Sequence, residues 1–174
     1  MKWLKQLLQY LKSRPEGGTS PEIKMGKEID PLKIRVRAEQ YYRSGDFFCS
    51  EAIVKAIVEG FHLPVPNLVI AMASGFPLGI GGSGCTCGAL TGGVMALGLF
   101  FGRTEPNDRK VKKCMKLSKT LHNHFRDRYP VVCCRDLTKG MRMGSSKHME
   151  QCISITGEIA EETARIILNQ KGIE

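Results

Sequence analysis

Residues 81–93, Gly-Gly-Ser-Gly-Cys-Thr-Cys-Gly-Ala-Leu-Thr-Gly-Gly, place Cys85 and Cys87 within a run of glycines, directly before an apolar segment. A helix that begins here directs free backbone amides and the positive end of its dipole toward the cysteines, which stabilises a thiolate. A thiolate is both a metal ligand and a nucleophile. The stretch therefore predicts a metal site or a reactive thiol site at a helix start.

Two other interpretations of these glycines stay open. Residues 79–84, Gly-Ile-Gly-Gly-Ser-Gly, satisfy the G-x-G-x-x-G pattern of phosphate-binding loops. That chemistry requires a βαβ unit or a Gly-Lys-Ser/Thr ending, and the sequence predicts neither, so nucleotide binding is disfavoured. A tight turn that uses positive φ angles is the other interpretation. It leaves the cysteines unexplained.

Cysteines from distant segments are expected to meet this one. Helical periodicity turns Cys49 and Cys152 toward the interior, and Cys133 and Cys134 follow each other in Val-Val-Cys-Cys-Arg-Asp-Leu. Together with Cys87 they can converge on one interior cluster. No C-x-x-C pair is present, so the spacing is not that of a zinc ribbon or a thioredoxin-type site. Each cysteine also remains a candidate for plain apolar packing.

The elements that must position these residues are predicted to be helices. The sequence indicates an all-α fold, a compact bundle of about five to six helices around a central Gly-rich apolar helix. That central segment, residues 87–102, is shorter than the roughly 20 residues that span a bilayer. Residues 68–76 are too short for periodicity to decide between strand and helix. The remaining helices are expected within residues 32–60, with a break at 44–46, over 107–129 and over 149–172.

The same periodicity assigns side chains to the inner faces of the helices. Phe48 is expected on the buried face of the second helix, and Met115 on that of the helix over 107–129. His122, His124 and His148 lack metal-ligand spacing to one another, so we expect surface residues, with His148 in a loop.

The amino-terminal part differs from the rest in composition. Residues 1–13 form an amphipathic, basic helical pattern that suits an anionic membrane surface, a partner helix or the domain itself. A linker rich in proline and glycine follows. We therefore divide the chain into an amphipathic helix with a flexible linker, 1–31, and one compact domain, 32–174.

The net charge of +9 comes from one region. Between Arg103 and Lys147 there are 13 Lys and Arg residues against 4 Asp and Glu residues. Such a surface favours an acidic partner or an anionic lipid, and a solvated basic face without a partner is the alternative; nucleic acid is not expected. The odd number of cysteines and the absence of a signal-peptide pattern favour a reducing cytoplasm, with possible membrane association through residues 1–13. A homodimer stays open.

Four segments together resemble a known family. They are Phe-Cys-Ser-Glu-Ala-Ile at 48–53, Cys-Gly-Ala-Leu-Thr-Gly at 87–92, Cys-Arg-Asp-Leu-Thr-Lys-Gly at 134–140, and a cysteine in the last amphipathic helix. In order and context they resemble the redox-active proteins named for their C-GCAxxG-C-C cysteine pattern, over roughly residues 34–168. The resemblance places the pattern cysteines on Cys49, Cys87, Cys134 and Cys152, and the motif glycines on Gly84, Gly88 and Gly92. Cys85 and Cys133 lie outside the pattern but close enough in sequence to substitute for their neighbours.

The resemblance implies a four-cysteine redox site, and the family is similar to split-Soret cytochromes, which carry c-type haem and an iron–sulfur centre. No C-x-x-C-H is present, so covalent c-type haem is not expected. We expect an iron–sulfur protein that transfers electrons to a redox partner protein of unknown identity. Two alternatives remain: a metal-free thiol–disulfide switch or oxidoreductase, and a binding module with structural zinc whose basic helix contacts an acidic partner. Glu51 and Asp136, which adjoin pattern cysteines, are expected to be surface carboxylates.

Overall fold

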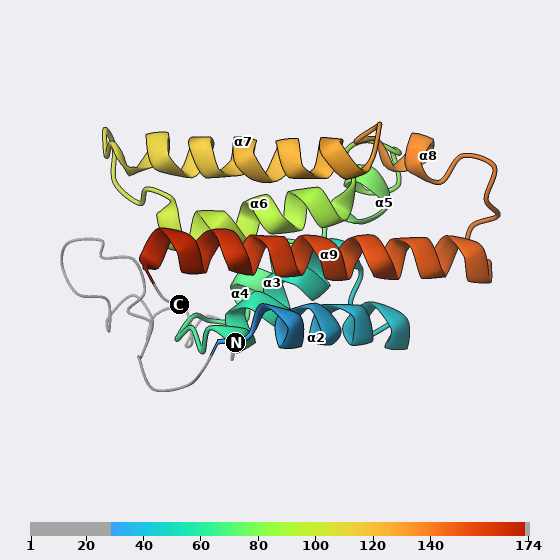
Figure 1. Ribbon diagram of the computed structural model, residues 1–174, viewed down its shortest axis with the longest axis horizontal. Helices are drawn as coiled ribbons and strands as arrows, with labels where there is room; N and C mark the ends of the chain where they lie inside the picture. The colour runs from blue at the N-terminus through green and yellow to red at the C-terminus, as the bar shows by residue number, and fades with distance from the viewer. Residues whose placement is uncertain (1–28, 173–174) are drawn as a thin grey trace, which may run out of the picture.

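The computed structural model describes residues 29–172, and the predictions for the amphipathic helix and for the linker up to residue 28 lie outside them. Within this range the chain forms helices and no strands, which confirms the all-α prediction (Figure 1). The helices are α2 (Pro31–Ser44), α3 (Cys49–Gly60), α4 (Leu68–Ala71), α5 (Pro77–Ile80), α6 (Gly88–Phe101), α7 (Lys110–Arg128), α8 (Cys134–Leu137) and α9 (Ser146–Lys171).

The longer helices form a bundle, and α6 lies inside it. Helix α6 packs against α3, α7 and α9, while α2 covers α3 and α9 from the other side (Figure 1). Its side chains are apolar all round, as expected of a buried helix, and Leu97 and Phe100 are almost fully buried. The Gly-rich apolar segment is therefore the central helix, as its sequence predicts.

Glycines let the neighbouring helices approach α6 closely. A Cβ atom at Gly92 would lie 2.7 Å from both the Cα and the carbonyl oxygen of Ser50 in α3. One at Gly93 would lie 2.7 Å from Leu121 in α7 and 2.8 Å from Thr163 in α9. Such distances are shorter than real contacts, so side chains at these two positions would push the helices apart.

The starts of two helices differ from the sequence prediction. Helix α9 begins at Ser146, three residues before the predicted start, because the Ser145 side chain accepts a hydrogen bond from the His148 amide and caps the helix. Helix α3 begins at Cys49, so Phe48 is its N-cap residue and is 54% exposed. The prediction that Phe48 lies on the buried face was wrong, because Phe48 precedes the helix.

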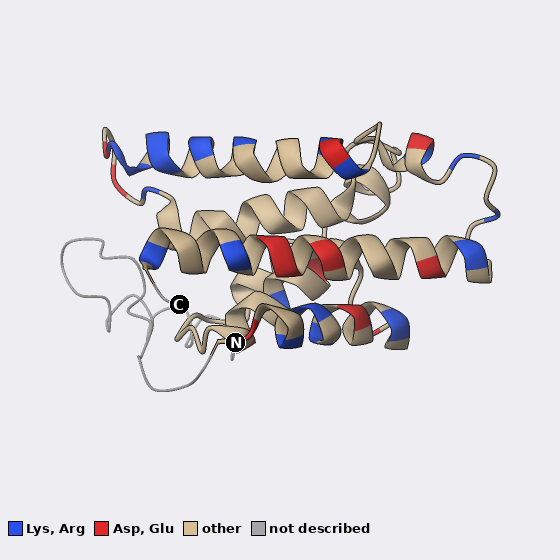
Figure 2. Cartoon of the chain, viewed as in Figure 1, with Lys and Arg blue, Asp and Glu red and all other residues tan. Residues whose placement is uncertain are grey.

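Helix α7 lies at the edge of the bundle and presents a basic outer side. Leu117, Leu121 and Phe125 form its buried stripe, and Lys and Arg residues follow its outer edge (Figure 2). The prediction that Met115 faces inward was wrong: it is 67% exposed, because the stripe in contact with α6 and α9 is narrow.

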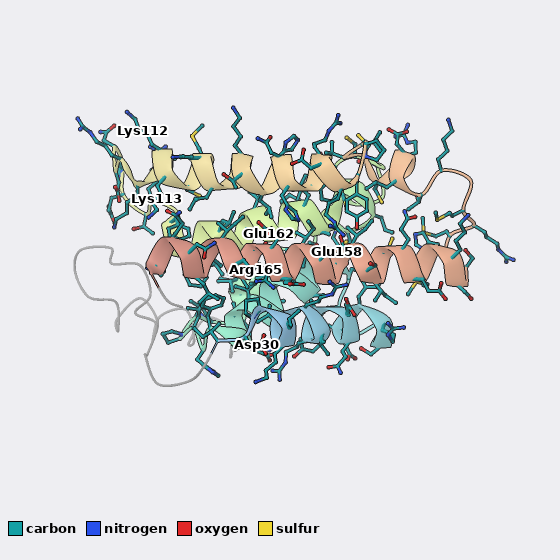
Figure 3. The ribbon with its side chains drawn as sticks, viewed as in Figure 1. Asp30, Lys112, Lys113, Glu158, Glu162 and Arg165 are labelled. Carbon is teal, nitrogen blue, oxygen red and sulfur yellow. The ribbon has the colours of Figure 1, made fainter. Side chains whose placement is uncertain are left out.

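Ion pairs join α9 to the helices on either side. Arg35 of α2 lies 3.2 Å from Glu161, and Arg128 of α7 lies 3.0 Å from Glu158. Figure 3 shows Glu158 and Glu162 on the side of α9 that faces the viewer. The short segment that periodicity left undecided contains the single-turn helix α4. None of the helices within residues 29–172 is long and apolar enough to cross a membrane.

Candidate redox site

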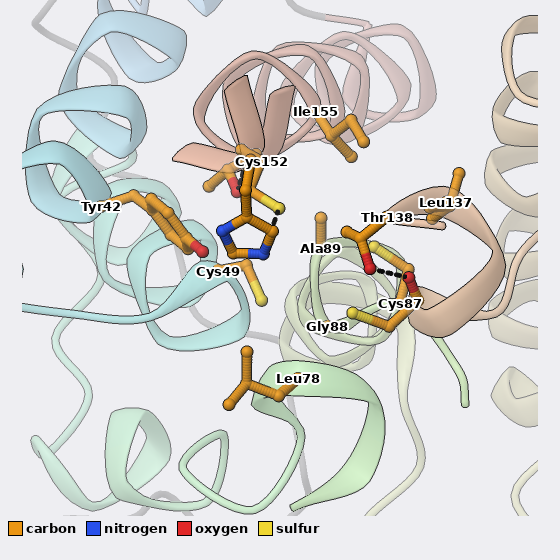
Figure 4. A pocket seen from close by; sticks show the side chains of 13 residues that line it. Tyr42, Cys49, Leu78, Cys87, Gly88, Ala89, Leu137, Thr138, Cys152 and Ile155 are labelled. Carbon is orange, nitrogen blue, oxygen red and sulfur yellow. Dashed lines mark hydrogen bonds between the residues drawn. The ribbon is translucent and has the colours of Figure 1, made fainter. Parts of the chain in front are cut away.

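Four cysteines line one pocket at the end of the bundle where α6 and α9 begin. They are Cys49, Cys87, Cys134 and Cys152, the positions that the family pattern indicates (Figure 4). The cavity has a volume of about 20 Å³, which is roughly the space that one water molecule needs. The other lining residues are Tyr42, Leu78, Gly88, Ala89, Leu137, Thr138, His148, Ile155 and Thr156.

Each of these cysteines belongs to a different helix. Cys49 is the first residue of α3, Cys87 is the N-cap residue of α6, and Cys134 is the first residue of α8. Cys152 lies in the second turn of α9. Helix starts have backbone N–H groups without partners inside the helix, so three of the four sulfurs lie where such donors are concentrated.

Backbone hydrogen bonds hold the Cys87 loop against the Cys134 segment. The Cys87 amide donates to the Val132 carbonyl (2.8 Å), and the Arg135 amide donates to the Gly84 carbonyl (2.9 Å). Gly84 has a φ of +86°, and a Cβ atom there would lie 2.9 Å from the Arg135 Nε atom. Glycine at this position therefore permits both the turn and the contact with Arg135.

A second glycine makes room for a sulfur. A Cβ atom at Gly88 would overlap the Sγ atom of Cys49. The absence of a side chain therefore allows Cys49 to lie against the first turn of α6, beside Cys87. Gly92, one turn further along, maintains the same close approach of α3 to α6 through its contact with Ser50.

Burial keeps the pocket thiols protonated. It raises the pKa of Cys49, and the neighbouring Cys87 adds to this effect. Burial also raises the pKa of Cys87 to about 12, although the amides of Ala89 and Leu90 act in the opposite direction. The pKa values of Cys134 and Cys152 are raised by burial as well. Without a ligand, all four groups are neutral thiols at pH 7.

His148 belongs to this site, although the sequence predicted a surface residue in a loop. It is 2% exposed, because α9 begins before it and carries it into the pocket. Its Nδ1 atom accepts a hydrogen bond from the Gly144 amide (3.3 Å), which leaves the ring proton on Nε2. Nε2 lies 3.8 Å from the Cys152 sulfur (Figure 4). The spacing of four residues between His148 and Cys152 was the available sequence signal.

Tyr42 approaches the same sulfur from α2. Burial raises the pKa of the Cys152 thiol, and the nearby Tyr42 hydroxyl acts in the opposite direction. Burial raises the pKa of Tyr42, so the hydroxyl keeps its proton and remains a donor. Two donors, His148 and Tyr42, therefore face the sulfur of Cys152.

The other candidate residues lie outside the pocket. Cys85 is exposed and Cys133 is half-buried, and the nearby Cys85 thiol raises the pKa of Cys133. Glu51 accepts hydrogen bonds from the Phe48 amide (3.0 Å) and the Ser74 hydroxyl (2.6 Å), so it fixes the start of α3.

The remaining candidates are surface groups. Asp136 and His122 are exposed. His124 lies 3.8 Å from Glu162 on the flank of α9.

The four sulfurs share a pocket without surrounding one point. Within residues 29–172, no three His, Cys, Asp or Glu side chains form a group that could hold a single metal ion.

A family model described as "Putative redox-active protein (C_GCAxxG_C_C)" matches residues 47–166. The chain belongs to this family. The family name writes Gly-Cys-Ala in its central motif, whereas this member has Cys87-Gly88-Ala89. The structure explains the order here, because a side chain at position 88 would overlap Cys49 and Cys87 lines the pocket.

This member of the family is also similar to a protein of Archaeoglobus fulgidus named "Uncharacterized protein". The two are 25% identical over 130 residues, which cover 71% of this chain and 86% of the relative. No solved structure matches the chain.

Proposed function

We propose that this protein is an electron-transfer protein that binds an iron–sulfur cluster through Cys49, Cys87, Cys134 and Cys152. The observation that carries the proposal is that four cysteines from four helices line one pocket. Cysteine thiolates are the usual ligands of such clusters.

Zinc is the alternative metal for a set of four cysteines. A structural zinc ion draws four ligands around one atom, with Zn–S distances of about 2.3 Å. The four sulfurs share a pocket but form no group that could hold one ion, so zinc would require them to converge, whereas a cluster would bind them through different iron atoms of a larger inorganic core. The cavity of about 20 Å³ must widen to admit such a core.

The surroundings of the sulfurs supply the conditions for redox chemistry. When bound, the cluster would accept and release an electron. The amides of Ala89 and Leu90, the Nε2–H group of His148 and the hydroxyl of Tyr42 face the sulfurs and stabilise negative charge on them. The apolar side chains around them exclude water, which strengthens these interactions. Because ligand binding must deprotonate buried thiols, cluster binding is expected to weaken as the pH falls.

The same burial disfavours metal-free thiol chemistry inside the pocket. A thiolate is the attacking species in thiol–disulfide exchange, and burial raises the pKa values of Cys49 and Cys87. Without metal, these two groups are therefore slow nucleophiles. A thiol–disulfide switch that uses the pattern cysteines is accordingly the second choice.

The basic outer side of α7 supports a proposal for the redox partner. Lys112, Lys116 and Lys119 are exposed, and basic residues follow the outer edge of this helix (Figure 2). We propose that an acidic partner protein docks here, because complementary charges accelerate encounter. Electron transfer to such a partner should slow as the ionic strength rises, and the charge reversal K112E/K116E/K119E should remove that salt dependence.

Metal and acid-labile sulfide analysis tests the cluster. The full chain is purified without oxygen, reconstituted with iron and sulfide, and analysed together with its visible absorption spectrum. Four variants, C49S, C87S, C134S and C152S, are compared with the control C114S, whose cysteine lies outside the pocket. Circular dichroism and denaturation establish that each variant folds.

The outcomes separate the candidates. Stoichiometric iron and sulfide in the wild type and in C114S, with loss in folded pocket variants, support the cluster. Stoichiometric zinc without sulfide would instead indicate a structural metal site. A colourless, metal-free wild type after reconstitution would exclude the cluster and leave thiol chemistry.

A further inference from the structure

Two cysteines outside the four-cysteine pocket form a pair of their own. Cys85 is exposed and Cys133 is half-buried, and neither lines the pocket. The Cys85 thiol lies near enough to Cys133 to raise the pKa of the Cys133 thiol. Neither position belongs to the family pattern, so the proposed cluster leaves both thiols without a role.

The backbone holds this pair in place from both sides. The Arg135 amide donates to the Gly84 carbonyl (2.9 Å), and the Cys87 amide donates to the Val132 carbonyl (2.8 Å). Residue 85 lies between 84 and 87, and residue 133 lies between 132 and 135. The two segments therefore run antiparallel, with the cysteines one register position apart.

This arrangement suits disulfide formation without movement of the helices. A disulfide requires Cα atoms within roughly 7 Å of each other. Facing residues of antiparallel segments lie about 4.5–5.5 Å apart, and an offset of one position adds about 3.4 Å along the chain, so the Cα atoms of Cys85 and Cys133 are expected about 6 Å apart. The guanidinium of Arg135 further fixes the turn, because its Nη2 atom donates to the Ser83 carbonyl at 2.7 Å.

We propose that Cys85 and Cys133 form a second redox site, a surface dithiol that reduces low-molecular-weight disulfides and closes to an intramolecular disulfide. Cys85, the exposed member, attacks one sulfur of the small disulfide as a thiolate. The S–S bond of the small molecule breaks, a mixed disulfide forms on Cys85, and one small thiol leaves. Cys133 then attacks the Cys85 sulfur and displaces the second small thiol.

The exchange is balanced. Two electrons pass from the cysteine pair to the small disulfide, and the protons of the two protein thiols end on the two small thiols that are released. The new bond links the loop before α6 to the segment before α8. The pocket ligands Cys87 and Cys134 take no part, so this site goes beyond the proposed cluster and is independent of it.

Peptide mapping tests the pair in the full chain. Reduced protein is incubated without oxygen with excess oxidised glutathione, remaining thiols are blocked with N-ethylmaleimide, and the protein is digested with trypsin. Cleavage gives the peptides 56–103 and 129–135, and each contains one cysteine of the surface pair and one of the pocket. The variants C85S and C133S therefore identify the linked residues, and C114S serves as the control.

The expected result is a linked peptide pair, lighter by two hydrogen atoms, in the wild type and in C114S. C85S should give no linked pair, and C133S should retain glutathione on Cys85 because the second attack is missing. The proposal is overturned if the linked pair persists in C85S or C133S, since the bond would then join Cys87 or Cys134. It is equally overturned if folded wild-type protein forms no linked pair. Iron binding is measured separately, so failure here is distinguishable from failure of the cluster.

Discussion

The contact between Gly92 and Ser50 predicts opposite effects for two identical substitutions in one helix. In Gly92→Ala, the new methyl group meets the Cα and carbonyl oxygen of Ser50 at 2.7 Å and the carbonyl carbon at 3.1 Å. These are backbone atoms, so rotation of a side chain does not relieve the overlap and α3 must move away from α6. In Gly98→Ala, nothing lies within 4 Å of the new methyl group.

The magnitudes follow from these two environments. Overpacking costs about 1–3 kcal/mol, and a contact with backbone belongs in the upper part of that range. Alanine recovers about 1 kcal/mol of helix propensity relative to glycine. Gly92→Ala should therefore destabilise the protein by about 1–2 kcal/mol. Gly98→Ala should stabilise it by about 0.5–1 kcal/mol.

Urea denaturation of the metal-free protein under reducing conditions measures both values. Gly92→Ala should also lower iron incorporation, because α3 carries Cys49 and α6 begins beside Cys87. Equal stability of the two variants, or a more stable Gly92→Ala, would refute the close approach of α3 and α6 as the reason for glycine at position 92.

Three further predictions concern charge and reactivity. Burial acts to raise the pKa of Glu158, but hydrogen bonds from Tyr129 and Arg128 outweigh it and leave the pKa below its ordinary value of 4.5. This stabilisation is present above that pH and is lost as the pH falls through the folded-state pKa, so E158Q should cost about 1 kcal/mol at about pH 7 and progressively less as the pH of the urea titrations is lowered through the folded-state pKa; a cost that does not fall with pH would contradict it. His148→Leu should lower the midpoint potential of the reconstituted protein by on the order of tens of millivolts, because the donor to Cys152 is lost; His122→Leu, at an exposed position, is the control, and an equal shift in both would point to a non-specific effect. In metal-free protein, iodoacetamide followed by peptide mapping should modify exposed Cys85 at least tenfold faster than Cys49, whose burial raises its pKa; comparable rates would indicate an open pocket.

Much of the bundle was predictable because its helices carry long apolar stripes. Periodicity indicated α2, α3, α7 and α9 and the inward direction of Cys49 and Cys152, a continuous apolar run indicated α6, and the family pattern supplied Cys87 and Cys134. Helices α5 and α8 have four residues each, too few to show a periodic pattern.

The parts that sequence reasoning missed depend on helix boundaries and on backbone contacts. The sequence prediction places His148 in a loop because it does not identify Ser145 as the N-cap residue of α9. The helix begins three residues earlier than predicted, and it therefore carries the His148 side chain into the pocket instead of leaving it in solvent. The prediction for Phe48 was wrong because of another helix boundary: α3 begins at Cys49, and Phe48 precedes it. The pairing of residues 84 and 135 through main-chain atoms leaves no side-chain pattern at all, so the contact between Cys85 and Cys133 was not foreseeable.

Helix α8 differs from the other helices around the pocket, because none of its residues is buried. Besides its own turn, it is attached by hydrogen bonds from the Arg135 amide to the Gly84 carbonyl and from the Arg135 guanidinium to the Ser83 carbonyl (2.7 Å), and by one from the Gln151 side chain to the Leu137 carbonyl (2.6 Å). Detaching such a segment requires far less free energy than unfolding a bundle whose core lies between α3, α6 and α9. Local opening at α8 would therefore give the proposed cluster a path into and out of the pocket without unfolding of the bundle. In the proposed cluster site, Cys134 moves with α8 and would therefore be the last cysteine to bind and the first to dissociate.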